Sequence, residues 1–208
     1  MLFLPIILGL FFGSPDAPLP STPGAEKLDE VSRLHFELDL EEVLDEAVFR
    51  EAWYRACERD THPRVLAIAD MTQPSSAKRL YVIDLHERRL VLRTWVAHGR
   101  GTGELMAERF SNVEGSLCTS LGLYRVGTRI ISPKHGNALL LHGLEPGLND
   151  RALQREIIMH GADYVSPEFI AQEGRLGRSW GCPAVQRKDM VVLADLLAEG
   201  DVLYIHGR

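Results

Sequence analysis

Residues 160–185 read HGADYVSPEFIAQEGRLGRSWGCPAV, and they hold a cysteine between a glycine and a proline. Neither neighbour suits the interior of a helix or of a central strand, so Cys182 is expected on a fixed, partly exposed loop. A thiol in such a position is more typical of chemistry than of packing. A His-Gly pair, His160 and Gly161, lies a short loop upstream. The stretch therefore predicts a reactive cysteine on a loop, with a histidine from a neighbouring segment.

Short β-rich runs separated by turn residues surround this stretch. The sequence predicts seven strands, at 64–71, 79–85, 88–99, 122–131, 137–143, 156–161 and 201–207. Such a set is typical of a β-sandwich or a partly closed barrel rather than of a doubly wound parallel sheet. We therefore expect a mainly β fold with helices, of the α+β class.

Helical patterns occur before, within and after this β-rich region. Apolar residues four apart from Leu44 to Ala56 predict a helix of about four turns, with room for a shorter one before it. Ser166 followed by Pro167 is typical of an N-cap and first helical residue, which predicts a short helix over 167–173. An apolar face over 190–198 predicts a late amphipathic helix, with Gly200 as its C′ residue.

The chain is expected to divide into four segments: an apolar segment (1–14), a proline-rich linker (15–27), a helical appendage (28–61) and a catalytic domain (62–208). The apolar run 2–12 is too short for a bilayer core of about 30 Å and has the length of a signal-peptide core. No Lys or Arg precedes it, Pro5 interrupts it, and no clean cleavage site follows. We expect export, and the alternatives are a buried N-terminal strand or a misassigned start.

Composition limits the partners and the cysteine chemistry. A chain of 208 residues with 45% apolar residues has enough material for one core, and its net charge of −6 argues against a nucleic-acid ligand. The three cysteines are an odd number, so at least one remains free or pairs between molecules. Cys57 and Cys118 are expected to be small buried hydrophobic residues, or else a disulfide pair in an exported protein.

A nucleophilic cysteine needs a nearby base or a positive field, because an ordinary thiol is mostly protonated at neutral pH. His160 ends a predicted strand and can serve as that base, with a backbone carbonyl beside Gly161 holding its ring. The amides of Gly181 and Cys182 are candidates for an oxyanion hole, whereas Pro183 has no donor. The Ser179 hydroxyl is a candidate for orienting this turn.

The spacing of these residues resembles the signature of the L,D-transpeptidases, also called YkuD-type domains. The signature is a His-Gly pair, a loop and Ser-x-Gly-Cys, and here it reads His160-Gly161 and then Ser179-Trp180-Gly181-Cys182. The stretches 97–128, 139–166 and 174–185 resemble the murein L,D-transpeptidase branch more widely, and the likeness covers about residues 64–207.

The resemblance implies an enzyme that acts on peptidoglycan outside the cytoplasmic membrane and needs no cofactor or metal. Cys182 would attack a carbonyl of a donor stem peptide, with His160 as its base. The resulting thioester would be transferred to an amine of an acceptor stem. Family members commonly carry His where Trp180 stands, and a polar residue near the position of Ala184. These departures leave the donor preference open.

Several further residues are candidates for binding substrate. Arg178, Arg187 and Arg175 are candidates for replacing the lost polar residue, because guanidinium groups pair well with carboxylates. The alternative for this basic cluster is a solvated face. Trp180 is a candidate for stacking on substrate or simply for packing. The remaining candidates at the cleft are Ser120, Tyr124 and His98, and the alternatives are ordinary strand and turn residues. No tight spacing of ligands supports a metal site.

Three other functions stay open at this point. Water instead of an amine as acceptor would make the protein a carboxypeptidase or endopeptidase. A protein of another class would be a catalytically silent module that binds the cell wall. A cytosolic thiol enzyme would require the first segment to be ordered core.

Overall fold

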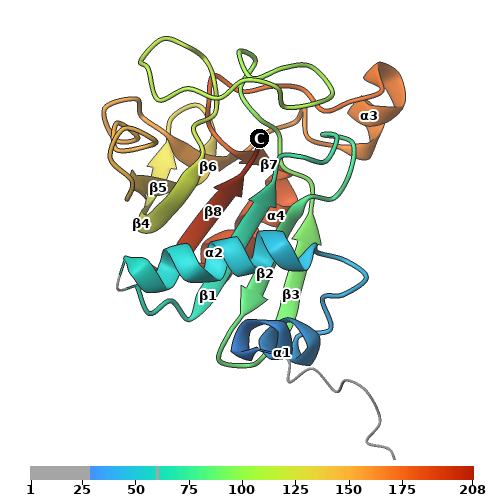
Figure 1. Ribbon diagram of the computed structural model, residues 1–208. Coiled ribbons are helices and arrows are strands. Elements are labelled where there is room, and N and C mark those ends of the chain that lie inside the picture. The colour runs from blue at the N-terminus through green and yellow to red at the C-terminus, as the bar shows by residue number, and fades with distance from the viewer. Residues whose placement is uncertain (1–28, 60) are drawn as a thin grey trace, which may run out of the picture.

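The computed structural model describes residues 29–59 and 61–208 (Figure 1). The apolar segment 1–14 and the linker 15–27 that we expected lie outside these described residues. Within the described ranges, no helix combines the length and the apolar character needed to cross a membrane.

One mixed sheet organises the molecule. Its strands are β1 (Val65–Asp70), β2 (Leu80–Asp84), β3 (Arg89–Thr94), β4 (Gly122–Ser132), β5 (Gly136–Gly143), β6 (Ile158–Gly161), β7 (Ala184–Val185) and β8 (Val202–His206). They lie in the order β3-β2-β1-β8-β4-β5-β6-β7. The pairs β1/β8 and β6/β7 are parallel, and the other neighbours are antiparallel. The expected mainly β, α+β fold is confirmed.

The two edges of the sheet approach each other where the chain leaves β3. Ala97 and Ala184 exchange two backbone hydrogen bonds, of 2.8 and 3.3 Å, which join the segment after β3 to β7. The sheet is therefore nearly closed and barrel-like. This junction also explains why β3 stops at Thr94, although the sequence predicted a strand to residue 99. Closure makes β7, the short strand that follows Cys182, part of the framework.

The strands bury both faces, because residues alternate between two cores. Along β1, Val65, Ala67 and Ala69 pack in the core that contains the apolar side of α4 (Arg187–Leu196). Leu66 and Ile68 face the opposite core, formed with α1 (Glu30–Glu37) and α2 (Glu46–Glu58). Figure 1 shows α1 and α2 in front of the sheet and α4 behind it. The segment predicted as a helical appendage is thus packed directly on the sheet.

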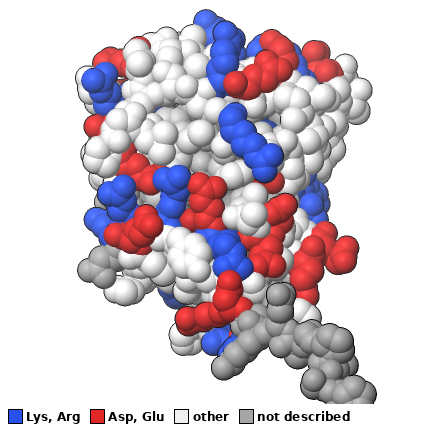
Figure 2. Space-filling model, viewed as in Figure 1, with Lys and Arg blue, Asp and Glu red and all other residues white. Residues whose placement is uncertain are grey.

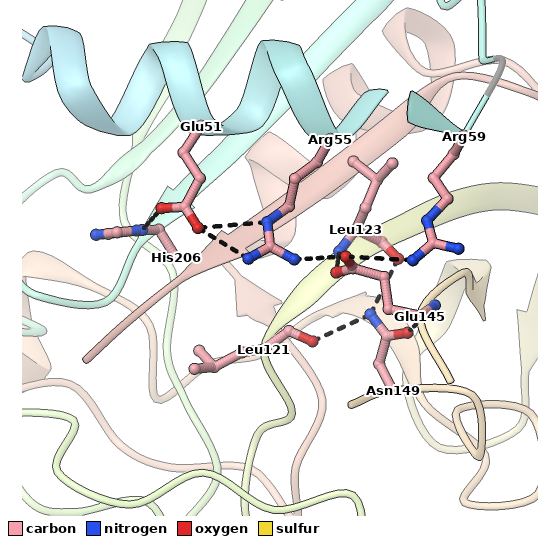
Figure 3. A network of polar contacts seen from close by, with 8 residues as sticks. All are labelled: Glu51, Arg55, Arg59, Leu121, Leu123, Glu145, Asn149 and His206. Carbon is pink, nitrogen blue, oxygen red and sulfur yellow. Dashed lines mark hydrogen bonds and ion pairs between the residues drawn. The ribbon is translucent and has the colours of Figure 1, made fainter. Parts of the chain in front are cut away.

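A polar network fastens α2 to the sheet (Figure 3). The buried Glu145 carboxylate accepts from the Leu123 amide at 2.8 Å and from Arg55 of α2 at 2.5 Å. Asn149 closes the loop beyond β5 by accepting from the Glu145 amide and donating to the carbonyls of Leu121 and Leu123. The first half of the loop that leads from β5 to β6 is therefore fixed against both the helix and the sheet.

The late helices differ in how closely they match the sequence. The helix α3 (Pro167–Glu173) has the predicted bounds, with the Ser166 hydroxyl capping the Phe169 amide at 3.1 Å. The helix α4 begins at Arg187 and ends at Leu196, so it lies a few residues earlier than the predicted helix. Gly200 is not its C′ residue; it adopts a φ of 101° in the turn before β8. The short strand β7 was not predicted, because two residues carry no periodic pattern.

Candidate active site

A cleft of about 710 Å³ opens beside β6, and both Cys182 and His160 line it. The register of β6 and β7 places His160 opposite Ala184, and the His160 amide donates to the Pro183 carbonyl at 3.3 Å. The two strands therefore hold the histidine next to the residue that follows Cys182. The predicted pair is brought together by the short parallel contact that closes the barrel.

The tautomer of His160 follows from its hydrogen bond. Nδ1 lies 3.1 Å from the Gly161 carbonyl oxygen, which accepts, so Nδ1 carries the proton and Nε2 keeps its lone pair. Burial lowers the pKa of His160 to about 4, and the nearby charges of His135, Lys134 and Arg187 act in the same direction. The imidazole is thus neutral at pH 7 and can accept a proton. The backbone carbonyl beside Gly161 that the sequence suggested as orienting group is the one observed.

The Cys182 thiol is protonated in this resting arrangement. Burial raises its pKa, although a hydrogen bond from the Ile158 amide and the charge of Arg155 act in the opposite direction. The thiol donates to the Glu156 carbonyl over 3.8 Å, and across the described residues it has no hydrogen bond to the His160 ring. The pair therefore consists of a neutral thiol and a neutral base, and it requires proton transfer during attack.

The turn that carries Cys182 is fixed by Ser179. The Ser179 hydroxyl donates to the Cys182 carbonyl at 2.6 Å and accepts from the Gly181 amide at 3.1 Å. Gly181 has a φ of 130°, and a Cβ there would lie 2.9 Å from the Cys118 carbonyl oxygen. This position therefore requires glycine. The structure corrects one expectation: because its N–H is engaged by Ser179, Gly181 does not offer a free oxyanion donor.

The predicted basic cluster does not act as a unit. Arg178 lines the cleft and pairs with Glu104, and Arg175 pairs with the same carboxylate at 3.0 Å. Arg187 lies outside the main cleft and pairs with Asp163, with 2.9 Å between Nη2 and Oδ2. All three guanidinium groups thus form ion pairs, with Arg175 and Arg178 sharing the one Glu104 carboxylate. Arg175 and Arg187 are corrected as cleft residues, whereas Arg178 keeps its place there.

Trp180 stands at the cleft as an exposed side chain. It is 68% exposed, and the Lys134 ammonium lies 4.9 Å from its ring centroid. The Lys134 ammonium and the Trp180 indole thus form a cation–π pair, which gives this side of the cleft a flat surface with a positive charge. The position fits the expected contact with substrate, which remains a prediction.

Three residues expected at the cleft are instead buried away from its lining. His98 accepts from Arg79 at Nδ1 over 2.8 Å and faces the Gly103 carbonyl with Nε2, so it supports the strand junction. Ser120 and Tyr124 are buried and joined by a 2.6 Å hydrogen bond between their hydroxyl groups. The structure corrects all three as substrate contacts, because internal hydrogen bonds occupy their polar atoms.

Sequence reasoning missed several residues of the lining. They are Lys134, Arg155, Glu156 and Tyr164, whereas His135 was considered as a possible lining residue and does line the cleft. The His135 ring lies against the His160 ring, with 3.7 Å between centroids. These residues come from the β4–β5 turn, the end of the β5–β6 loop and the segment after β6, outside the motif. The sequence contained no motif that pointed to these residues. The only available signal was that Arg155, Glu156 and Tyr164 lie close in sequence to the strand that contains His160.

The two other cysteines, Cys57 and Cys118, differ in burial. All three cysteines are free; Cys118 is buried as expected, whereas Cys57 is exposed on α2 and is corrected as a buried residue. Across the described part of the chain, no group of three His, Cys, Asp or Glu side chains is arranged to hold a metal ion. Figure 2 shows acidic and basic side chains intermixed over α2.

Comparisons with solved structures give remote similarity. The chain is 13% identical to an L,D-transpeptidase from Mycobacterium smegmatis, covering 69% of this chain and 59% of that one, with a TM-score of 0.43. It is also 13% identical to an L,D-transpeptidase from Stackebrandtia nassauensis, covering 86% and 76%, with a TM-score of 0.43. L,D-transpeptidase 3 from Mycobacterium tuberculosis, solved with a faropenem-derived adduct, is 14% identical over 70% and 61%, with a TM-score of 0.42. The chain thus spans about three-fifths of the mycobacterial proteins.

No curated protein matches the chain at a significant level. The model of the L,D-transpeptidase catalytic domain family, however, matches residues 40–206, which include α2, the whole sheet and the cleft. The chain therefore belongs to the L,D-transpeptidase catalytic domain family.

Proposed function

We propose that the protein cross-links peptidoglycan stem peptides by acyl transfer through a thioester on Cys182. The observation that carries the proposal is the shared cleft of Cys182 and His160, with His160 held as a neutral base. Family membership supplies the reaction class, L,D-transpeptidation of peptidoglycan stems. The geometry of the cleft suggests Cys182 as the nucleophile and His160 as the base for this reaction.

In the acylation step, the Cys182 thiol gives its proton to Nε2 of His160 while sulfur bonds to a carbonyl carbon of the donor stem. The tetrahedral intermediate then collapses: its carbon–nitrogen bond breaks, and the protonated His160 returns the proton to the departing amine. The products are a thioester and a free amine. His160 starts unprotonated, so it can accept the thiol proton, and its low pKa favours the later return of that proton to the departing amine.

In the second step, an acceptor amine attacks the thioester carbonyl and loses a proton to His160, and the sulfur leaves. The thiolate takes that proton back, which restores the resting pair. Water in place of the amine gives a trimmed stem by the same steps. The partition depends on which nucleophile is admitted to the cleft.

The lining of the cleft suits a donor that carries carboxylates. Three of its side chains, Lys134, Arg155 and Arg178, are basic, and one, Glu156, is acidic. Although the protein as a whole has a net charge of −6, this cleft is locally cationic. We therefore assign the binding of stem-peptide carboxylates to Lys134 and Arg178 of the cleft lining.

We also propose that the reaction takes place outside the cytoplasmic membrane. The support is the apolar run 2–12, which has the length of a signal-peptide core, and the location of the peptidoglycan substrate. Fractionation of cells that carry a tagged full-length chain tests this proposal. Recovery of the tag in the cytosol alone would refute export.

The test of the activity is mass spectrometry of disaccharide tetrapeptides and pentapeptides incubated with the purified protein. We expect cross-linked dimers and a transient adduct on Cys182, both absent from Cys182→Ala and present in Cys57→Ala. Trimmed monomers alone would make the protein a hydrolase. Unchanged substrates, with wall binding retained in Cys182→Ala, would replace the proposal with a silent wall-binding module.

A further inference from the structure

The turn around Cys182 provides too few donors for the oxyanion that acyl transfer creates. When sulfur attacks a carbonyl, the carbonyl oxygen becomes negative and requires preorganised hydrogen-bond donors. The Gly181 amide already donates to Ser179 over 3.1 Å, and Pro183 has no N–H. In residues 181–183 only the Cys182 amide is left. A second donor has to come from another segment.

Arg155 lies at the required place. It lines the same cleft as Cys182, and its Nη2 would lie 3.2 Å from a Cβ built on Gly181. Its charge also acts on the Cys182 thiol, where it opposes the effect of burial. The guanidinium group therefore lies beside the backbone that presents the nucleophile.

The guanidinium group is fixed in position. Nη1 donates to the Ser111 carbonyl at 2.9 Å and to the Ser120 hydroxyl at 3.0 Å, while Nη2 donates to the Cys118 carbonyl at 2.5 Å. Ser120 is itself bonded to the buried Tyr124 hydroxyl. Three of the five N–H donors of an arginine are thus engaged, which leaves the Nε hydrogen and one Nη2 hydrogen.

The charge of Arg155 is also uncompensated. All three of its protein acceptors are neutral oxygens, and within residues 29–59 and 61–208 it has no ion pair with a carboxylate. The neighbouring Arg178, in contrast, is paired with Glu104. A fixed cation with spare donors and no counterion is suited to stabilise a negative charge that appears during the reaction.

We propose that Arg155 is a catalytic residue that, together with the Cys182 amide, hydrogen-bonds the oxyanion of the tetrahedral intermediate. The oxyanion forms as the sulfur–carbon bond forms. It is lost when the carbonyl is restored and the carbon–nitrogen bond breaks, so Arg155 neither gains nor loses a proton. The proposal rests on the acyl-transfer step at Cys182 described above, but not on the identity of the stem peptide.

Two small reagents separate this role from others. The neutral ester p-nitrophenyl acetate acylates a thiol through a tetrahedral oxyanion and carries no carboxylate, whereas iodoacetamide alkylates it without forming an oxyanion. Peptide mass mapping gives both rates at Cys182 and at the exposed Cys57, which serves as an internal reference. The measured quantity is the ratio of the acylation rate to the alkylation rate.

In the unaltered protein we expect a higher ratio at Cys182 than at Cys57. Arg155→Ala should lower the ratio at Cys182 by about 100-fold and leave Cys57 unchanged. Added guanidinium ion at non-denaturing concentration should restore part of the loss, and Arg155→Lys should be intermediate because it keeps charge without the fork. Arg151→Ala, which removes an exposed arginine from the same loop, is the matched control and should leave the ratio unchanged.

The contrary outcomes are distinct. Equal ratios at the two cysteines of the unaltered protein, or equal falls of acylation and alkylation in Arg155→Ala, would overturn the proposal, because Arg155 would then act on the thiol or on the fold alone. An unchanged ratio with weaker stem-peptide binding would make Arg155 a carboxylate anchor instead. Labelling of buried Cys118 reports unfolding of a variant, in which case Arg155→Lys decides. Failure to cross-link stems would refute the wall function without affecting these ratios.

Discussion

Arg55 and Arg155 are both partly buried arginines fixed by several hydrogen bonds, but they differ in charge balance. Arg55, on α2, pairs with Glu145 at 2.5 Å and with Glu51 at 3.0 Å (Figure 3). Arg155, at the cleft, is bonded only to two carbonyl groups and a hydroxyl. The charge of Arg55 is balanced by ion pairs that hold α2 to the sheet. The charge of Arg155 has no such partner and can interact with a ligand in the cleft.

The same contrast extends to the groups around each arginine. Around Arg55, the Glu145 carboxylate is saturated by an amide and a guanidinium group. Around Arg155, the cleft contains a neutral imidazole and a protonated thiol whose pKa values are shifted by burial. Such shifts cost folding energy and are typical of reactive sites. Substitutions should therefore affect activity at the cleft and stability at α2, and they should do so separately.

The largest effect is expected for His160→Ala. Removal of the base should lower the rate of acylation of Cys182 by stem peptides by about 10²–10⁴-fold with little change in stability. Stopped incubations analysed by intact mass would measure it. His135→Ala, which removes the ring packed against His160 but leaves the base, is the matched control and should cost less than about tenfold. Equal losses in both variants would contradict the assignment of the base.

The next effect belongs to the α2 region. Glu145→Gln leaves Arg55 without its buried partner and weakens the acceptor for the Leu123 amide, so the free energy of unfolding should fall by about 3 kcal/mol. Urea denaturation would measure the change. Acylation per folded molecule should stay within about twofold, since the pair lies outside the cleft lining. A large loss of activity in folded protein would show that the two regions are coupled.

The sequence predicted the framework better than the site. Among the described residues, period-two patterns located seven of the eight strands and helical patterns located α2 and α4, because burial on a sheet or helix face imposes those periods. The Ser166-Pro167 cap located α3, and α1 was anticipated only as a shorter helix without bounds. β7 was missed because its two residues have no pattern, although it positions His160 next to Cys182. Closure of the barrel was anticipated only in outline, since the Ala97–Ala184 junction depends on backbone hydrogen bonds alone.

Within the site, the motif identified Cys182, His160 and Ser179. The prediction of which arginines line the cleft was wrong for Arg175 and Arg187. Arg175 and Arg187 lie close to Cys182 in sequence, but they form ion pairs with Glu104 and Asp163 outside the cleft lining. Arg155 is further away in sequence, and nothing in its local context marked it. Which arginine lacks a counterion depends on contacts between distant loops, which neither spacing nor composition encodes.

An effect of similar size is expected from pH. His98 and His160 have pKa values lowered to about 4 by burial, so between pH 6.5 and 4 the unfolded chain binds protons that the folded protein does not. Stability is therefore full above pH 6.5 and falls as the pH drops, by about 2 kcal/mol per histidine at pH 5. Urea midpoints at pH 7 and pH 5 would measure the loss. Equal stability at both values would mean that neither histidine is held neutral.

The smallest effect is expected where an arginine is paired at the surface. Arg129 of β4 and Asp195 of α4 are 3.1 Å apart, with side chains 44% and 71% exposed. Water already solvates both charges, so Arg129→Ala should change the free energy of unfolding by less than about 1 kcal/mol, and even less at high salt. Paired urea curves at low and high salt would detect it. We expect an arginine to affect stability or activity in this protein when its charge is removed from water. A carboxylate balances that charge at Arg55, and the cleft leaves it unbalanced at Arg155. A loss of stability in Arg129→Ala as large as that in Glu145→Gln would contradict this distinction.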